Sequence, residues 1–413
     1  MKKILRPYFG LEPHVRNILM ADFFIQLVNS SFFLLLNYLM VDNGYKDHEI
    51  ANFRSYQYLA VMLFAFPLGI FIRGRKVKPL FYVSSILTPV LSLVIIYAIS
   101  HKLDNVLYWS FSLWGAAYTC LQIPALPFIL VNSRKETHTE AIVVFFLTSS
   151  TSTALCGLLN FALHRYLSHV FDVKLLMQCF AVLGFASFYF VHRINITENS
   201  STKIKLFNFH QHYDWRLILR AMIPTLTIAV GAGFTIPFIN LFFLNVHHLE
   251  ADGFSLLGSF TFFLVTISII LVPEIKRRFG YGIAVTLAQG LSVFCLIMLA
   301  FTQYYSELAV AVYLAGFFYV LRQPLMNIAA PVTSEVSMYY VGKRNQELMS
   351  AINSAIWSGS WFISSQFFSM LRSGGMSYAG IFFITAALYS VGTLMYYLLI
   401  RDFERRKKDG LMD

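Results

Sequence analysis

The feature that most constrains this chain is a series of long apolar blocks separated by short polar stretches. The blocks are roughly 20 to 28 residues long, and a helix of about 20 residues crosses a hydrocarbon core of about 30 Å. Of the 413 residues, 57% are apolar and 13% are charged. Because a water-soluble chain of this size could not bury that much apolar surface, the blocks predict membrane-spanning helices.

We expect about twelve spanning helices and therefore an all-α membrane protein. A β-barrel would show stretches of about ten residues with alternating polarity, because lumen-facing and lipid-facing side chains alternate along a strand. No block in this chain alternates in that way. The predicted spans cover residues 16–41, 50–72, 78–100, 105–131, 139–164, 172–192, 217–244, 254–275, 281–302, 306–333, 345–371 and 377–400.

Basic residues are distributed unequally between the two sets of loops. Of the 32 Lys and Arg residues, 25 fall in the loops and termini on one side of the predicted spans, which places both termini in the cytoplasm. The net charge of +11 is thus a topology signal, and no nucleic-acid partner is expected because the basic residues form no continuous face. We expect a multi-pass monomer in the lipid bilayer of a bacterial plasma (inner) membrane.

The longest polar stretch separates six predicted spans from six. It indicates an N-terminal six-helix bundle at residues 1–192, a cytoplasmic linker at residues 193–216 and a C-terminal six-helix bundle at residues 217–413. The two halves also share helix-bending residues. Gly115 precedes Pro124 in the fourth span, and Gly316 precedes Pro324 in the tenth. The offsets of 201 and 200 residues agree with a duplicated six-helix unit.

Two loop segments share a pattern of glycine and basic residues. Residues 69–76, after the second span, read Gly-Ile-Phe-Ile-Arg-Gly-Arg-Lys, and residues 273–280, after the eighth, read Pro-Glu-Ile-Lys-Arg-Arg-Phe-Gly. These segments resemble the loop signature of the major facilitator superfamily and its weaker second copy. The resemblance implies two six-helix bundles that rock around a central cavity lined mainly by helices one, four, seven and ten. It also implies a gating loop that comprises Gly69, Arg73, Gly74, Arg75, Lys76, Lys276, Arg277, Arg278 and Gly280.

The chain departs from the family pattern at two places. Ile72 stands about where the family usually has an acidic residue that stabilises the outward-facing state, which puts gating by that charge in doubt. The fifth span also lacks the Gly-Pro-Gly-Gly pattern of many drug/proton antiporters of this superfamily. That difference counts against assuming antiport.

Two arginines inside predicted spans are candidates for function, because an ionisable side chain is costly in a bilayer. Arg322 lies in the tenth span beside Pro324 and Pro331, where a kinked helix could present it to a carboxylate or phosphate. The alternative is a structural pair with a neighbouring acid or carbonyl. Arg54, at the start of the second span, could attract an anion or extend to the headgroups.

Asp22 is the acid that lies more than a turn inside a span. At helical spacing it shares one face of the first span with Gln26, Asn29 and Phe33, and such a polar stripe should face the bundle interior. Asp22 is therefore the candidate proton carrier if transport is coupled to protons. The alternative is a structural partner for a cytoplasmic basic loop.

Two further spans carry residues typical of a ligand cavity. In the seventh, Gly231, Gly233 and Pro237 would let the helix flex or break. In the eleventh, Trp357 and Trp361 would provide aromatic walls for an amphipathic ligand, or contact lipid. The candidate substrate-binding residues are Arg322, Gln323, Asn327, Gln122, Asn29, Gln26, Asn240, Trp357 and Trp361.

These patterns favour a secondary active transporter that moves a small organic solute, amphipathic or anionic, by alternating access, with coupling to protons left open. No enzyme activity, cofactor or metal site is expected, because the spans lack clustered catalytic residues and the chain has no phosphate-binding loop. Alternatives within the same fold are a lipid or lysolipid flippase and a transporter-derived sensor. A channel would more often have fewer helices in each chain.

Overall fold

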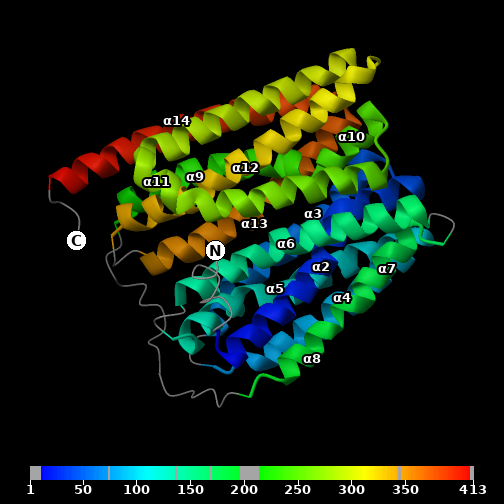
Figure 1. The fold of residues 1–413 in the computed structure, drawn as a ribbon, viewed down its shortest axis with the longest axis horizontal. Helices are drawn as coiled ribbons and strands as arrows, with labels where there is room; N and C mark the ends of the chain where they lie inside the picture. The colour runs from blue at the N-terminus through cyan, green and yellow to red at the C-terminus, as the bar shows by residue number, and fades with distance from the viewer. Residues whose placement is uncertain are drawn as a thin grey trace. The chain divides into compact units, whose positions relative to one another are not determined.

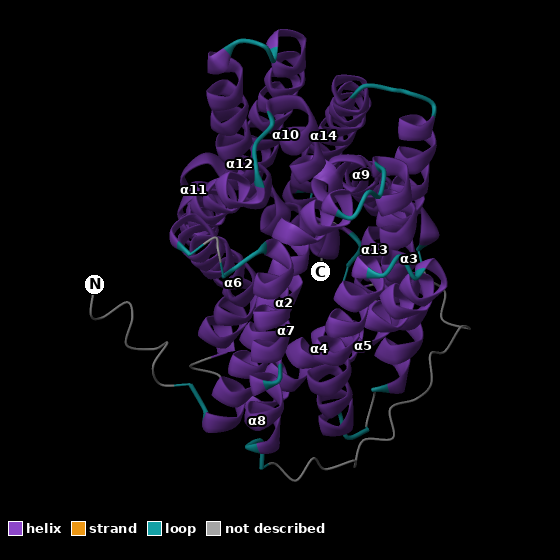
Figure 2. Cartoon of the chain, turned by 90° about the vertical axis from the view of Figure 1, so that its right-hand side faces the viewer, coloured by secondary structure: helices purple, strands orange, loops and turns teal. Residues whose placement is uncertain are grey.

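The computed structural model describes residues 11–72, 75–134, 138–167, 170–195, 214–342 and 346–409. Within these ranges the chain forms helices joined by short connections and contains no strand (Figure 2). Nine segments of this described part are long and apolar enough to cross a membrane. The all-α membrane fold is therefore confirmed, and the number of twelve spans stays a prediction.

The chain divides into two compact units. The first unit comprises Met1–Lys46 and Tyr56–Phe207, and the second comprises Asp47–Ser55 and Asn208–Asp413. The start of the second predicted span thus packs with the second unit. The predicted boundaries of the two bundles and their linker stay predictions, since most of the linker, residues 196–213, lies outside the described residues.

The first unit is built around its first helix, α2 (Pro13–Asp42). In the apolar stretch of this helix, 72% of the residues are buried inside the protein, against 50% for α4. Val15, Ile18 and Ile25 pack against Phe81 of α4 and Phe128 of α5. The polar side chains of Asp22, Gln26 and Asn37 on α2 are buried within the protein. The other helices are α3 (Asp47–Phe71), α4 (Lys78–Ser100), α5 (Asp104–Asn132), α6 (His138–Tyr166), α7 (Val173–Gly184) and α8 (Ala186–His192).

The sixth predicted span, 172–192, corresponds to one segment long and apolar enough to cross a membrane, Val173–His192, in which Phe185 keeps a helical backbone conformation (φ −64°, ψ −19°) between two helices. Helix α7 ends at Gly184, and α8 begins at Ala186. A methyl group at Gly184 would lie 2.5 Å from Val28 Cγ2 and 3.0 Å from Pro89 Cγ. The glycine therefore lets this span approach α2 and α4 closely, as small residues do between membrane helices.

In the second unit, the seventh predicted span is broken, as the glycines and proline predicted. Helix α9 (Trp215–Thr235) ends in the 3₁₀ turn η1 (Ile236–Phe238), and α10 (Ile239–His247) continues from it. Pro237 has no N–H to donate and cannot sit inside a regular α-helix without cost. The remaining elements are α11 (Ala251–Phe301), η2 (Thr302–Tyr305), α12 (Ala309–Tyr340), α13 (Gln346–Ser373) and α14 (Tyr378–Lys408), of which α11, α12 and α14 are coloured yellow-green to red in Figure 1.

The predicted spans 254–275 and 281–302 are two separate segments in the structure, because Gly280, with φ 73° and ψ 177°, interrupts the helix of α11 between them. Helix α14 continues past the predicted end at residue 400. Arg405 and Arg406, one turn beyond Asp402, donate to its carboxylate. Such pairs at helical spacing stabilise the polar last turns of the helix.

Candidate functional site

The carboxylate of Asp22 is fully buried in the first unit and is bonded by two neutral donors. Gln122 Nε2 on α5 donates to Asp22 Oδ1 over 2.6 Å, and Thr148 Oγ1 on α6 lies 2.5 Å from Asp22 Oδ2. Among the described residues no basic side chain forms an ion pair with Asp22. These contacts do not support the alternative in which Asp22 pairs with a cytoplasmic basic loop.

A chain of amide and hydroxyl donors leads to Asp22. Gln26 Nε2 donates to Gln122 Oε1 over 3.3 Å, and Gln26 Oε1 accepts from Asn29 Nδ2 at 3.3 Å and from the Tyr118 hydroxyl at 3.2 Å. Each donor points toward the carboxylate, so the chain stabilises its charged form. We define the Asp22 cluster as Asp22, Gln26, Asn29, Tyr118, Gln122 and Thr148.

The structure thus brings Gln26, Asn29 and Gln122 together with Asp22, and it adds Tyr118 and Thr148, which the sequence analysis missed. Tyr118 lies four residues before Gln122 and so shares its helix face, which is a signal that could have found it. Thr148 carries no such signal, because a threonine in an apolar span commonly bonds only its own helix.

The hydroxyl of Thr148 has one proton and two acceptors in reach. Its oxygen lies 2.5 Å from Asp22 Oδ2 and 2.6 Å from the carbonyl oxygen of Phe145. When Asp22 is ionised, Thr148 donates to the carboxylate. When Asp22 holds a proton at Oδ2, the carboxyl can donate to Thr148, and Thr148 can donate to Phe145. The cluster can therefore hold or release a proton without repacking.

We expect Thr148→Val to lower the stability of the protein by about 1–3 kcal/mol, because it leaves a buried carboxylate with one donor fewer. Thr148→Ser keeps the hydroxyl and should stay close to wild type. The unfolding temperature in detergent measures both effects. Equal losses in the two variants would show that methyl packing, and not the hydroxyl, matters at this position.

Arg322 is buried near the middle of α12, with 1% of its surface exposed. Its Nη2 donates to the Tyr389 hydroxyl over 3.3 Å, and its guanidinium carbon lies 5.6 Å from the centre of the Tyr389 ring. Arg322 Nε has no hydrogen-bond partner, and no carboxylate in the described ranges forms an ion pair with Arg322. A buried cation bonded only to a phenol is incompletely compensated.

Close helix packing holds the residues beside Arg322. A methyl group at Gly231 of α9 would lie 2.9 Å from the Tyr389 ring, so only glycine leaves room for that ring. Tyr319, three residues before Arg322, packs with its ring centre 5.5 Å from Phe243 and 6.0 Å from Phe254. The surroundings of Arg322 are therefore aromatic.

The other candidate residues of the second unit serve their own helices or lie nearer the surface. Asn327 Nδ2 donates to the Gln323 carbonyl over 2.9 Å, and Asn240 Oδ1 accepts from the Leu241 N–H at 3.0 Å. Gln323 is buried, Trp357 is 38% exposed and Trp361 is half-buried. Their part in substrate binding stays a prediction.

Arg54 is buried and does not extend to the headgroups. It lies in the segment of α3 that packs with the second unit, and its Nη1 donates to the Pro237 carbonyl over 3.2 Å. The Leu241 N–H, which would face that carbonyl in a continuous helix, donates to Asn240. Arg54 therefore supplies a hydrogen bond at the break between α9 and α10.

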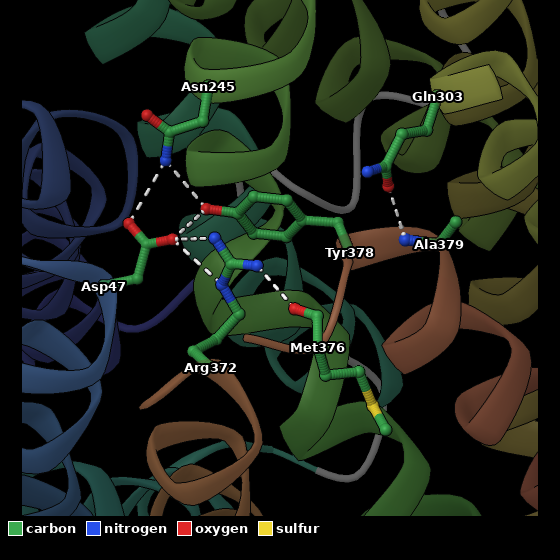
Figure 3. Close-up of polar contacts among 7 residues, drawn as sticks. All are labelled: Asp47, Asn245, Gln303, Arg372, Met376, Tyr378 and Ala379. Atoms are coloured by element: carbon green, nitrogen blue, oxygen red, sulfur yellow. Dashed lines mark hydrogen bonds and ion pairs between the residues drawn. The ribbon is translucent and has the colours of Figure 1, made fainter. Parts of the chain in front are cut away.

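A second polar network, at the start of α3, joins four elements of the second unit (Figure 3). Asp47 Oδ2 accepts from Arg372 Nε at 3.0 Å and Nη2 at 2.7 Å, and also from the Tyr378 hydroxyl. Asn245 Nδ2 donates to Asp47 Oδ1 over 3.1 Å, and Arg372 Nη1 donates to the Met376 carbonyl over 2.6 Å. The network thereby ties α3 to α10, α13 and α14.

Asp47 and Arg372 should show a coupling of about 0.5–3 kcal/mol in a double-mutant cycle of Asp47→Asn and Arg372→Gln. The pair is mostly shielded from water, and each partner has further bonds that fix its geometry. Unfolding temperatures of the two single variants and the double variant measure the coupling. Strictly additive losses would mean that the ion pair contributes nothing beyond its separate contacts.

The family of this chain follows from its likeness to known proteins. The family model described as Major Facilitator Superfamily matches residues 18–365. The chain belongs to the Major Facilitator Superfamily. Membership makes it a membrane transporter of small molecules, in agreement with the resemblance seen in the two loops. No curated protein matched the chain.

Solved structures of other transporters share the major facilitator fold of this chain. A bacterial homologue of the iron transporter ferroportin, in its inward-facing state, is 14% identical with a TM-score of 0.71, and the match covers 94% of this chain and 98% of that one. A mutant of the nucleoside transporter NupG is 11% identical with a TM-score of 0.67, covering 94% and 99%. An auto-inhibited POT family peptide transporter is 11% identical with a TM-score of 0.71, covering 94% and 97%. At these identities the likeness concerns the fold alone.

The structure describes the second loop of the major facilitator signature more completely than the first. In the first copy, Arg73 and Gly74 lie outside the described residues, whereas the Arg75 guanidinium lies 4.3 Å from the centre of the Phe71 ring. Gly69 belongs to α3, and a methyl group there would meet no atom within 4 Å. Lys76 follows in the short connection before α4.

In the second copy, Lys276 Nζ donates to both oxygens of Glu335 on α12, at 3.0 and 2.8 Å. Arg277 and Arg278 form ion pairs with Glu274. The second loop is therefore held by two acids, of which Glu335 was missed in the sequence because it lies 59 residues away. A gating role for either loop stays a prediction.

Proposed function

We propose that this transporter moves a small organic anion, amphipathic in character, across a bacterial plasma membrane by alternating access. In this proposal both chain termini lie in the cytoplasm and residues 1–192 and 217–413 form the two rocking bundles. Arg322 binds the anionic group of the substrate, and Asp22 carries a coupled proton. The observation that carries the proposal is the buried Arg322 guanidinium with no acidic partner among the described residues.

The energetic argument starts from the cost of a buried cation. Removing a guanidinium from water is expensive unless an anion or several acceptors replace its hydration. Tyr389 supplies one acceptor, and Arg322 Nε has none. A carboxylate or phosphate could accept two parallel N–H bonds from this side chain. Substrate binding would then supply the compensation that the chain itself leaves incomplete.

Asp22 supports the proton-coupled form of the proposal. Ionisable groups within membrane helices are costly, and such groups commonly serve proton relays. Asp22 is buried, lies among neutral donors and has in Thr148 a hydroxyl that suits either protonation state. Gln122 donates to the other carboxylate oxygen of Asp22, and Gln26 donates to Gln122.

A thermal-shift screen of purified protein against grouped solutes tests the proposed function, since a ligand that binds only the folded state raises the unfolding temperature. We expect organic carboxylates or phosphates to stabilise wild type and to leave Arg322→Ala unchanged. Ser390→Ala is the matched control, because the Ser390 hydroxyl donates to the Ala386 carbonyl one turn away on its own helix. Equal stabilisation of wild type and Arg322→Ala, or stabilisation by lysolipids alone, would favour a neutral solute or a flippase.

A further inference from the structure

We infer that the transporter carries one proton with one monovalent organic anion, so that its cycle moves no net charge across the membrane. This inference rests on the proposed function and adds to it the charge of the substrate and the stoichiometry of coupling. It follows from an inventory of the charged side chains that the described part of the chain buries.

Among the side chains that the structure describes, three of Asp, Glu, Lys or Arg are buried: Asp22, Arg54 and Arg322. Arg54 is bonded to the Pro237 carbonyl at the break of the seventh span and serves that helix. Asp22 is then the buried acid, and Arg322 the buried base, whose contacts within the described chain are to neutral groups alone. One proton site and one anion site are thus available.

Three less deeply buried acids near the ends of helices in the second unit are paired with basic residues. Asp47 pairs with Arg372 and Glu335 with Lys276. Asp402, at the end of α14, pairs with three arginines, which are Arg220, Arg405 and Arg406. A second proton bound at any of these three acids would have to break its ion pair. A dianionic substrate would leave one charge uncompensated at Arg322.

The charge balance of loading follows from these two sites. In the empty protein, the negative charge of Asp22 and the positive charge of Arg322 sum to zero. In the loaded protein, the anion neutralises Arg322, and a proton from solution forms an O–H bond at Asp22 Oδ2. The sum is again zero, so loading does not change the charge that the protein buries. An anion bound without the proton would leave an extra negative charge to cross a low-dielectric region.

Protonation of Asp22 needs no second charged group. The hydrogen-bond donors to its carboxylate are Thr148 of α6 and Gln122 of α5, and Gln26 of α2 donates to Gln122. The titratable group that faces it is the Tyr118 phenol of α5, which donates to Gln26. The groups around Asp22 are thus neutral. Asp22 can therefore take up or release a proton without a change of charge on any neighbouring group.

Asp22→Asn separates proton uptake from folding. The asparagine oxygen can accept from Gln122, and its amide can donate to Thr148, whose own proton then goes to the Phe145 carbonyl. Both hydrogen bonds at residue 22 survive, and only the proton site is lost. Thr148→Ser serves as the matched control, because it keeps every donor and acceptor of the cluster.

The first experiment measures protons bound per anion. Lactate, p-aminohippurate and 4-hydroxyphenylacetate are the monovalent probes, and the one that stabilises wild type most is titrated calorimetrically in buffers of different ionisation enthalpy. At neutral to alkaline pH we expect wild type and Thr148→Ser to take up close to one proton per anion, and Asp22→Asn to take up none while still binding. Anion binding without proton uptake in wild type would overturn the inference and leave the proposed function standing.

The second experiment measures charge movement with the same probe in proteoliposomes. We expect a pH gradient, acidic on the uptake side, to drive accumulation, and a potassium diffusion potential to change the rate by less than about twofold. A net current, or uptake driven by the potential alone, would overturn the inference. If none of the three probes stabilises wild type or enters the vesicles, the proposed function itself fails, which is a separate outcome.

Discussion

Arg322→Met is expected to raise the unfolding temperature of the empty protein while abolishing the binding of organic anions. Methionine fills a similar volume without a charge, and replacing buried charged groups with apolar side chains often stabilises by about 1–4 kcal/mol. The site has aromatic neighbours and one neutral partner, so little is lost by removing the guanidinium. Thermal unfolding in detergent, with and without a stabilising anion, measures both effects.

The sign of this effect separates a functional from a structural arginine. A structural Arg322 would contribute stability, and its replacement would lower the unfolding temperature. The matched control is Arg372→Met at the Asp47 network, where removing the cation leaves a carboxylate without its charge partner and should destabilise the protein. A fall in the unfolding temperature in both variants would contradict the role we assign to Arg322. Because Tyr389 loses its donor in Arg322→Met, the double variant with Tyr389→Phe should be at least as stable as the single one.

Gly115→Ala is expected to destabilise the protein by about 1–3 kcal/mol or more through overpacking. A methyl group at Gly115 would lie 2.4 Å from the carbonyl oxygen of Gln57 and 3.4 Å from Ala60 Cβ. The obstacle is backbone, which cannot rotate away as a side chain can. Helices α3 and α5 would have to separate, and the shift would reach Trp114 and Tyr118 on either side of this position.

Gly316→Ala is the matched control that the internal repeat provides. Gly316 occupies the corresponding place in the tenth span, but a methyl group there would meet Leu257 Cδ1 at 3.5 Å, which is an ordinary contact. We expect this variant to unfold at or slightly above the wild-type temperature, since alanine favours a helix more than glycine does. Similar losses in Gly115→Ala and Gly316→Ala would contradict the prediction, because the loss would then not depend on the close backbone contact at Gly115.

Much of the fold follows from local composition. A lipid-exposed backbone must satisfy its own hydrogen bonds, so a long apolar block predicts a helix whatever its neighbours are. The break at Pro237 was predicted for a similarly local reason, because proline has no N–H to donate. The extension of α14 to Lys408 was not predicted, because it depends on pairs with Asp402 in a polar segment.

The candidate site also has features that the sequence predicts and features that depend on helix packing. Helical spacing was enough to place Asp22, Gln26 and Asn29 on one face of α2, and the cost of a charge in lipid was enough to single out Asp22 and Arg322. Their contacts could not be predicted. Thr148 lies 126 residues from Asp22, and Tyr389 lies 67 residues from Arg322, so both contacts depend on which helices pack together and in which rotation.

The sequence by itself determined that this chain spans a membrane by helices, that it has the loop pattern of a major facilitator, and that one acid and two arginines lie in apolar surroundings. Each of these rests on residues close together in the chain. Only the tertiary structure decided that Asp22 is held by neutral donors, that Arg54 bonds the broken seventh span and that Arg322 has no acid beside it among the described residues. The physical reason is that a charge is costly wherever it is buried, but its compensation depends on atoms that only helix packing brings within hydrogen-bonding distance.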